Sequence, residues 1–299
     1  MKQQIKSSLI LLLTATIWGV AFVAQSVGME YIGPFTFNAI RCVLGGLVLI
    51  PVILVLKKKK ETGAENQEKE DKKTLWTGGI ACGVILCIAS NLQQFGIMEA
   101  SVGKSGFFTA LYIVMIPVIG IFIGKRPGIK LWFCVALAVV GMYLLCMKDG
   151  SFTIERADIM LLLCALAFSV HILVVDYFSP KVDGVKMSCI QFFVCGVLSA
   201  VGMLFTETPD ISNIQAAWMP LLYAGLLSCG VGYTLQIVGQ KGINPIIASL
   251  IMSLESVISA LAGWVILGQV LSLKEIIGCV LMFVAIVITQ IPIGNKKTD

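Results

Sequence analysis

Long apolar segments alternate with short polar segments along the whole chain, and this pattern predicts membrane-spanning helices. A helix that crosses about 30 Å of hydrocarbon needs about 20 apolar residues, because each residue adds about 1.5 Å. The apolar runs are continuous, whereas the strands of a membrane barrel would alternate apolar and polar residues. We therefore expect an all-α integral membrane protein with ten transmembrane helices, at residues 7–27, 34–56, 75–97, 103–124, 128–147, 157–176, 185–205, 217–239, 246–267 and 273–293.

The positive charges between these segments predict the orientation of the chain. If the N-terminus is cytoplasmic, 17 of the 22 Lys and Arg residues fall on the cytoplasmic side, 4 fall outside and Arg41 lies within a span. Cytoplasmic loops of membrane proteins carry the excess of Lys and Arg. We therefore expect both termini in the cytoplasm and the chain in the cell membrane, which requires an even number of spans.

The composition agrees with a lipid environment and argues against several classes of protein. Of the 299 residues, 58% are hydrophobic and 13% are charged, and the mean hydropathy is +0.93, which is too apolar for a soluble globule of this size. The net charge of +5 is concentrated in loops, so we expect no nucleic-acid partner. Most of the ten cysteines lie in apolar runs without the paired spacing of metal ligands, and we interpret them as small buried residues.

The sequence also contains an internal repeat. An offset of 150 residues aligns segment 11–46 with 161–196 without a gap, and an offset of 144 aligns 124–140 with 268–284. A copy with five helices starts its second round from the opposite side of the membrane, so the two halves would be inverted relative to each other. Inverted halves are the architecture of secondary transporters, whose sites lie near the middle of the bilayer. The expected copies are residues 1–148 and 149–299.

Four short motifs resemble the EamA branch of the drug/metabolite transporter superfamily: Ile17-Trp18-Gly19, Arg41, Ser253-Leu254-Glu255 and Leu267-Gly268-Gln269. The similarity covers essentially the whole chain. It implies two inverted five-helix repeats and a permease for amino acids, other metabolites or drugs, with export favoured. Three positions depart from the family pattern: Ser256 replaces a proline, Gln269 replaces a glutamate, and Gly124-Lys125-Arg126 lacks the corresponding acidic residue.

Three ionisable residues stand out because they lie deep inside predicted spans, where a charge is costly unless it faces a cavity or a partner. Glu255 lies about 13 Å into the ninth span, where it could exchange a proton or make a structural hydrogen bond to a neighbouring helix. His171 is the only histidine, and it is a second candidate for proton transfer or an interhelical link. Arg41 keeps its charge, so it would bind a substrate anion, tie helices together or reach the interface.

Uncharged polar and aromatic residues suggest a lining for a central site. Asn91 and Gln94 share one face of the third span, and Tyr233 and Gln236 share one face of the eighth. We predict substrate binding by Trp18, Asn38, Arg41, Asn91, Gln94, Tyr233 and Gln236, and proton or ion coupling by Glu255 and His171.

The sequence contains no motif of an intramembrane enzyme and no phosphate-binding loop. We therefore expect neither catalysis nor a cofactor nor a bound metal. The expected partners are a small-molecule substrate and the lipid bilayer, with protons as a further partner if Glu255 or His171 couples transport to them, and the chain would act as a monomer or homodimer. A membrane scaffold or sensor without transport, and a carrier of nucleotide sugars or drugs, stay open as alternatives.

Overall fold

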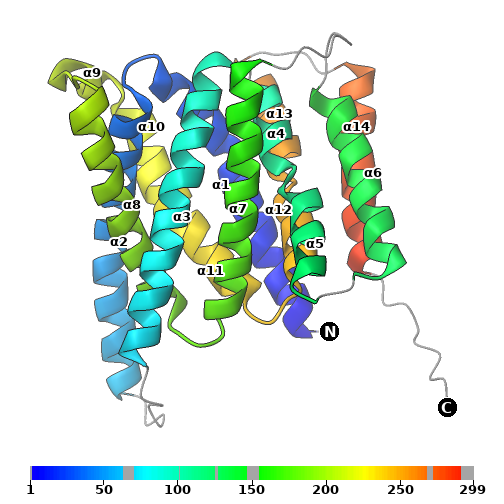
Figure 1. The fold of residues 1–299 in the computed structure, drawn as a ribbon, viewed down its shortest axis with the longest axis horizontal. Coiled ribbons are helices and arrows are strands. Elements are labelled where there is room, and N and C mark those ends of the chain that lie inside the picture. The colour runs from blue at the N-terminus through cyan, green and yellow to red at the C-terminus, as the bar shows by residue number, and fades with distance from the viewer. Residues whose placement is uncertain are drawn as a thin grey trace.

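The chain forms a bundle of helices (Figure 1) in a computed structural model that describes residues 2–62, 71–100, 102–124, 127–146, 155–267 and 272–290. These ranges contain no strand, so the prediction of an all-helical protein is confirmed. The helices are α1 (Lys2–Met29), α2 (Pro34–Thr62), α3 (Lys72–Glu99), α4 (Val102–Ala110), α5 (Tyr112–Phe122), α6 (Ile129–Cys146), α7 (Arg156–Phe178), α8 (Gly184–Thr206), α9 (Ile211–Ala216), α10 (Trp218–Leu222), the π-helix η1 (Tyr223–Tyr233), α11 (Thr234–Gln240), α12 (Pro245–Met252), α13 (Glu255–Leu267) and α14 (Leu273–Gln290).

Eight helical stretches of the described chain are long and apolar enough to cross a membrane, and each overlaps a predicted span. Two shorter apolar helices, Ile129–Leu144 and Ile276–Ile288, occupy the predicted fifth and tenth segments. The predicted repeat boundary at residue 148 and residues 268–269 of the last motif lie outside the described residues. The eight stretches are Gln4–Met29, Pro34–Lys58, Lys72–Glu99, Ser105–Phe122, Arg156–Phe178, Gly184–Thr206, Trp218–Gln240 and Pro245–Ile266.

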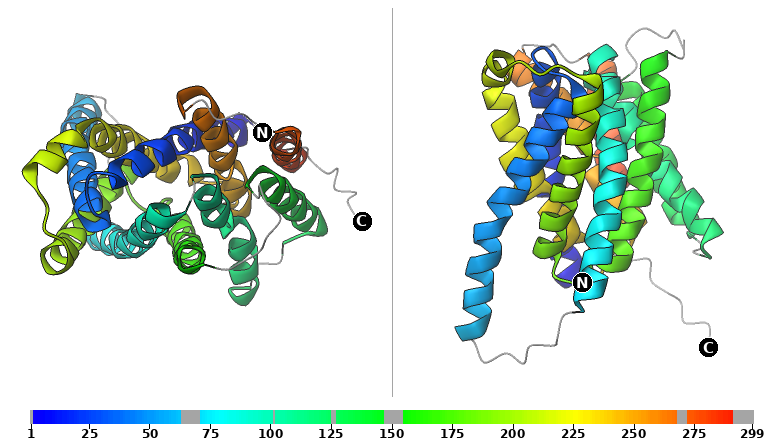
Figure 2. Two further views of the ribbon diagram at one scale, coloured as in Figure 1. Left: turned by 90° about the horizontal axis from the view of Figure 1, so that it is seen from above. Right: turned by 60° about the vertical axis from the view of Figure 1, so that its left-hand side comes forward.

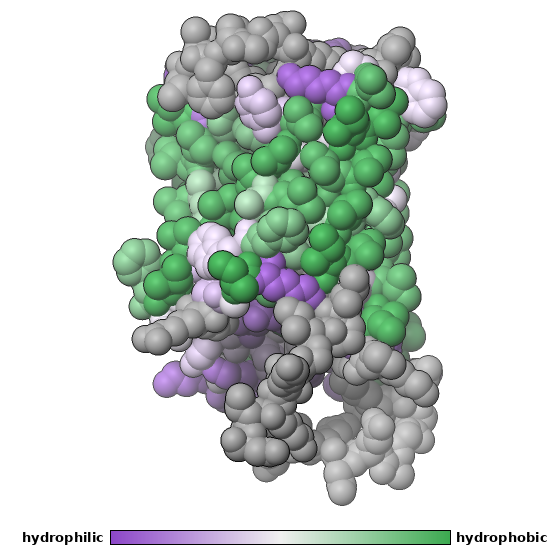
Figure 3. Space-filling view, turned by 90° about the vertical axis from the view of Figure 1, so that its right-hand side faces the viewer, coloured by the Kyte–Doolittle hydropathy of each residue, from purple (hydrophilic) through white to green (hydrophobic). Residues whose placement is uncertain are grey.

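The outer surface has the polarity of a protein that faces lipid. Large apolar side chains such as Val55, Phe122, Phe205 and Val265 are exposed. Figure 3 shows a hydrophobic band across one face, with polar residues towards its two ends. A soluble protein rarely exposes a continuous apolar surface of this extent, so the surface supports placement in a bilayer.

The helices contact each other in matching pairs. α3 packs against α7, and η1 with α11 packs against α1. α4 and α5 also pack against α7, whereas α12 and α13 pack against α1. In the chain direction, α1 begins at the lower end of Figure 1 and α7 begins at the upper end. α2 packs along α8, and α6 packs along α14 at one end of the elongated bundle (Figure 2).

Two spans are interrupted in the interior of the bundle. A turn at Leu111 separates α4 from α5, and a turn at Ser253 and Leu254 separates α12 from α13. At both turns a backbone N–H donates to the carbonyl three residues earlier, from Leu111 to Phe108 and from Leu254 to Ile251. The Ser253 hydroxyl donates to the Leu250 carbonyl, a local bond that competes with the regular helical ladder. The span is therefore interrupted at Ser253 and Leu254, just before Ser256, which replaces the proline of the family pattern.

Candidate functional site

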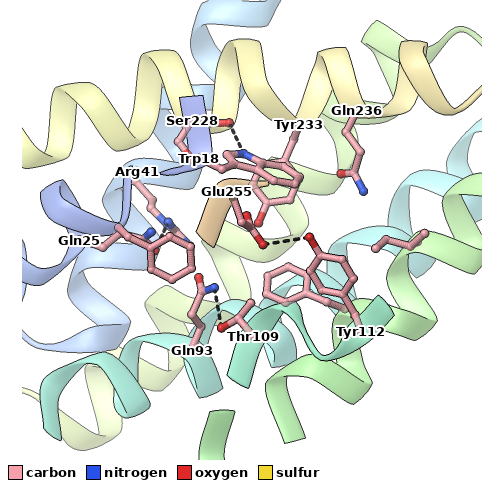
Figure 4. A pocket seen from close by; sticks show the side chains of 13 residues that line it. Trp18, Gln25, Arg41, Gln93, Thr109, Tyr112, Ser228, Tyr233, Gln236 and Glu255 are labelled. Atoms are coloured by element: carbon pink, nitrogen blue, oxygen red, sulfur yellow. Dashed lines mark hydrogen bonds between the residues drawn. The ribbon is translucent and has the colours of Figure 1, made fainter. Parts of the chain in front are cut away.

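A cavity of about 30 Å³ lies between helices of the first and second halves of the chain. Figure 4 shows its polar side chains converging from α1, α2, α3, α4, α5, η1, α11 and α13. The walls are largely aromatic and amide-bearing, with one guanidinium and one carboxylate. The lining residues are Trp18, Phe22, Gln25, Arg41, Gln93, Thr109, Tyr112, Phe168, Ile172, Ser228, Tyr233, Gln236 and Glu255.

Arg41 supplies the cation of the cavity. Its side chain is 2% exposed, and Nη1 donates to Gln25 Oε1 at 2.9 Å. The guanidinium carbon also lies 5.7 Å from the centre of the Phe37 ring. Within the described residues the Nε atom has no hydrogen-bond partner. A buried guanidinium held by one neutral amide is poorly compensated, so Arg41 is suited to bind an anionic group.

Glu255 supplies the carboxylate, and it is the first residue of α13. Its Oε1 accepts a hydrogen bond of 2.9 Å from the Tyr112 hydroxyl, and Tyr112 is the first residue of α5. Both side chains are buried. The bond therefore connects the two interrupted spans at their turns, beside the cavity.

Aromatic and amide side chains complete the walls. The ring centres of Trp18 and Tyr233 lie 4.6 Å apart at an angle of 55°. Gln93 Nε2 donates to Thr109 Oγ1 at 3.4 Å. Gln236 is buried, and its Oε1 has no hydrogen-bond partner among the described residues. The site thus offers flat apolar surfaces and an unused amide acceptor next to the two ionisable groups.

Comparison with known proteins decides the family. The model of the EamA-like transporter family matches twice, at residues 5–147 and 155–291. The chain belongs to the EamA-like transporter family. This family is part of the drug/metabolite transporter superfamily, so the resemblance drawn from the sequence motifs is confirmed, and the chain is a multi-pass membrane transporter.

Relatives of this EamA-like chain carry transporter names. An uncharacterized transporter of Archaeoglobus fulgidus is 26% identical over 94% of this chain and 84% of its own length. The uncharacterized transporter YwfM of Bacillus subtilis is 23% identical over 97% of this chain and 96% of its own length. A crystal structure with 18% identity matches with a TM-score of 0.76 over 95% of this chain and 96% of the other, which shows a shared fold.

Five of the nine predicted site residues of the EamA-like chain line the cavity: Trp18, Arg41, Tyr233, Gln236 and Glu255. His171 lies outside it, and its Nε2 is 3.1 Å from Gln191 Oε1 on α8. The His171 ring also packs edge-on against Tyr233, with 6.1 Å between ring centres. The geometry of His171 is that of a link between α7 and α8 behind the cavity wall.

Asn38, Asn91 and Gln94 also lie outside the cavity lining. Asn38 Nδ2 donates to Asn91 Oδ1 at 2.9 Å, and Asn91 Nδ2 donates to Ser199 Oγ at 3.0 Å. These bonds join α2, α3 and α8. Gln94 Nε2 lies 3.7 Å from Met29 Sδ. All three amides are buried between helices, so their substrate role stays a prediction that the cavity geometry does not support.

The EamA-like cavity includes polar residues that the sequence interpretation missed. On α3 the lining residue is Gln93 and not its neighbour Gln94. Thr109 and Tyr112 flank the turn of the fourth span, whose apolar stretch Ser105–Phe122 contains no Asp, Glu, Lys, Arg or His. The sequence signal was nevertheless present: at the 144-residue offset, the segment around Thr109 and Tyr112 corresponds to the segment around Glu255.

Proposed function

We propose that this chain is a secondary active transporter that moves small metabolites, amino acids or related compounds, out of the cell by alternating access. The observation that carries the proposal is the central cavity in which buried Arg41 and Glu255 both take part. Among the described residues, the partner of the Arg41 guanidinium is a neutral amide. Because a buried cation is costly without an anion, a substrate carboxylate is the natural counterion.

The cavity chemistry fits a compound with both charges. Arg41 would hold a carboxylate through charged hydrogen bonds. Glu255 would attract an ammonium group, and the rings of Trp18 and Tyr233 would cover apolar parts of the substrate. The present cavity of about 30 Å³ has room for about two water molecules. A metabolite therefore requires the surrounding helices to separate, as they do in alternating access.

The helix arrangement supports ten spans in two inverted copies. α1 and α7 start from opposite ends of the bundle (Figure 1), and the contacts of α1 match those of α7. The two turns, at residues 111 and 254, are 143 residues apart, close to the 144-residue offset of the sequence repeat. Interrupted helices in corresponding positions of two halves are typical of transporter sites. The shorter α6 and α14 would be the fifth and tenth spans.

Glu255 is the candidate for coupling to protons. A carboxylate accepts the hydrogen bond from Tyr112 more strongly than a neutral carboxyl group does. Protonation of Glu255 would therefore weaken the contact between α5 and α13. His171 remains a weaker candidate, because it lies outside the cavity and bonds to Gln191.

The test is flux through proteoliposomes that contain the purified protein, across a panel of amino acids, other metabolites, drugs and nucleotide sugars, with and without a pH gradient. We expect gradient-driven flux of carboxylate-bearing substrates. Arg41→Gln should raise the apparent KM at least about tenfold, because it removes charged hydrogen bonds. Glu255→Gln should keep exchange of substrate across the membrane and lose its dependence on the gradient.

Three results would contradict the proposal. Absence of flux for the whole panel, with folded protein, would favour a scaffold or sensor. Preferential transport of cationic drugs or nucleotide sugars would show that amino acids and related metabolites are not the substrate class. Full gradient-driven transport by Glu255→Gln would remove the coupling role of that residue.

A further inference from the structure

The eighth span contains a long π-helix, which is the least regular element of the bundle. η1 extends over 11 residues, from Tyr223 to Tyr233. π-helical segments are rare and are frequent at functional sites. η1 brings Ser228 and Tyr233 to the cavity, and Gln236 follows one turn later on α11. The register of η1 therefore decides which side chains of this span face the cavity.

Side chains and backbone of α1 support η1 along its length. The Trp18 indole Nε1 donates to the Ser228 carbonyl at 3.4 Å, as Figure 4 shows. Thr14 Oγ1, one turn earlier on α1, lies 3.4 Å from the Gly232 carbonyl. At the other end of η1, the Tyr223 hydroxyl donates to the Ile17 carbonyl at 3.1 Å. Carbonyls of an irregular helix need such external donors when they are buried.

The other half of the chain provides an internal comparison. α7 packs against α3 as α1 packs against η1 and α11. At the 150-residue offset, Cys164 and Phe168 of α7 occupy the places of Thr14 and Trp18. Phe168 has no donor and a thiol is a weak one. Correspondingly, α3 is a regular α-helix from Lys72 to Glu99. The π-helical register occurs where the two donors are present.

We propose that Thr14, which lies outside the cavity, is a positioning residue for transport: with Trp18 it holds the π-helical register of η1 and so keeps Tyr233 and Gln236 in the cavity wall. Because an α-helix turns by about 100° per residue, a register change of one residue would rotate Gln236 away. The effect of Thr14 on transport rests on the proposed function, whereas its effect on η1 does not.

The Thr14 hydroxyl is suited to a reversible contact. It lies 3.1 Å from the Ile10 carbonyl in its own helix and 3.4 Å from the Gly232 carbonyl. A hydroxyl has a single proton to donate. If η1 changes register and the contact with Gly232 is lost, the Thr14 hydroxyl can still donate to the Ile10 carbonyl of α1. The loss of the contact therefore leaves no buried donor unsatisfied.

Hydrogen–deuterium exchange on the full-length protein in nanodiscs, without substrate, tests the structural part. Thr14→Val removes the hydroxyl and keeps the branched shape. Exchange of residues 223–240 should rise about fivefold, as expected for one lost hydrogen bond, with exchange of residues 72–99 unchanged. Thr14→Ser should restore the wild-type rate. Thr16→Val is the matched control, because the exposed Thr16 donates to Leu12 in its own helix. Unchanged exchange, or an equal rise in both segments, would overturn the proposal.

Gly232→Ala provides a second variant, in which the substituted residue lies on η1 and not on α1. A Cβ atom at position 232 would lie 2.8 Å from Trp18 Nε1, so it should displace the indole and raise exchange in the same segment. In the flux assay, Thr14→Val should raise the apparent KM about fivefold and Thr14→Ser should not. If Thr14→Val raises hydrogen exchange in residues 223–240 but the wild-type protein transports nothing, the proposed function is refuted and the structural role of Thr14 is not. Normal KM in Thr14→Val, with wild-type flux, would refute the positioning role.

Discussion

Arg41 and Asn38 lie one turn apart on α2, yet their surroundings differ. Arg41 faces the cavity and has an unpartnered Nε among the described residues. Asn38 donates to Asn91, which donates in turn to Ser199. An amide inside a bundle can serve a ligand or a neighbouring helix, and only the direction of the side chain distinguishes the two roles. Here the asparagines connect α2, α3 and α8.

This difference gives a prediction for Asn38→Ala. Loss of an interhelical hydrogen bond should lower the free energy of unfolding by about 1 kcal/mol, measured as a lower midpoint of thermal denaturation in detergent. The apparent KM of transport should stay at the wild-type value. Arg41→Gln on the same helix is the comparison and should raise KM. A rise in KM of similar size in both variants would restore Asn38 to the substrate site.

Residue types and depth were sufficient to predict five of the thirteen residues that line the cavity. Glu255 and Arg41 are ionisable groups within apolar runs, so the sequence alone marks them. Whether Gln93 or Gln94 faces the cavity depends on the rotation of α3 about its axis. Two adjacent glutamines in the sequence do not reveal that rotation. Tyr112 is uncharged and lies in an apolar segment, so hydropathy gives no reason to select it. Its importance comes from the contact with Glu255, which is 143 residues away.

The first turn of α2 is held by a residue from the other half of the chain. The Glu207 carboxylate, just beyond α8, accepts hydrogen bonds from Phe35 N at 2.9 Å and Thr36 N at 2.8 Å. It also accepts one from Thr36 Oγ1 at 2.6 Å. A Cβ atom at Gly33 would lie 2.4 Å from the Glu207 carboxyl carbon. The glycine is thus required for this close approach.

Glu207→Ala should therefore act on the contact between α2 and α8. Removal of a helix cap costs about 1 kcal/mol, so the midpoint of thermal denaturation should fall. Asp210→Ala is the matched control, because Asp210 caps the short exposed helix α9 through Ser212 N. Equal destabilisation by the two variants would show that Glu207 acts as a local acidic residue and does not join the halves.

The interrupted and π-helical spans show why element boundaries were harder to predict than elements. A window of 20 apolar residues is the same for a straight helix and for two half-helices, so hydropathy does not locate the irregular turns within the predicted spans 103–124, 217–239 and 246–267. The turn at Ser253 and Leu254 depends on backbone bonds across three residues. The π-helix depends on donors from α1. Both features arise from contacts that hydropathy does not describe.

The proposed topology divides the loops of the bundle between the two sides of the membrane. The turn between α1 and α2, with exposed Tyr31, lies at the upper end in Figure 1, as does α9. The turn between α7 and α8, with exposed Lys181, lies at the lower end, where α1 begins. Because positive charge concentrates on the cytoplasmic side, the upper end should face outwards.

An impermeant maleimide applied to intact cells tests this arrangement. In a protein without native cysteines, Tyr31→Cys and Ser212→Cys should be labelled, because both positions lie in exposed segments at the outer end. Lys181→Cys should be labelled only after the membrane is permeabilised, which also shows that the site is reactive. Tyr31 belongs to the first half and Ser212 to the second. Labelling of both from outside the cell is therefore expected only if the second half is inverted relative to the first. Labelling of Lys181→Cys in intact cells, or of Tyr31→Cys without Ser212→Cys, would contradict the inverted topology and the transport cycle that depends on it.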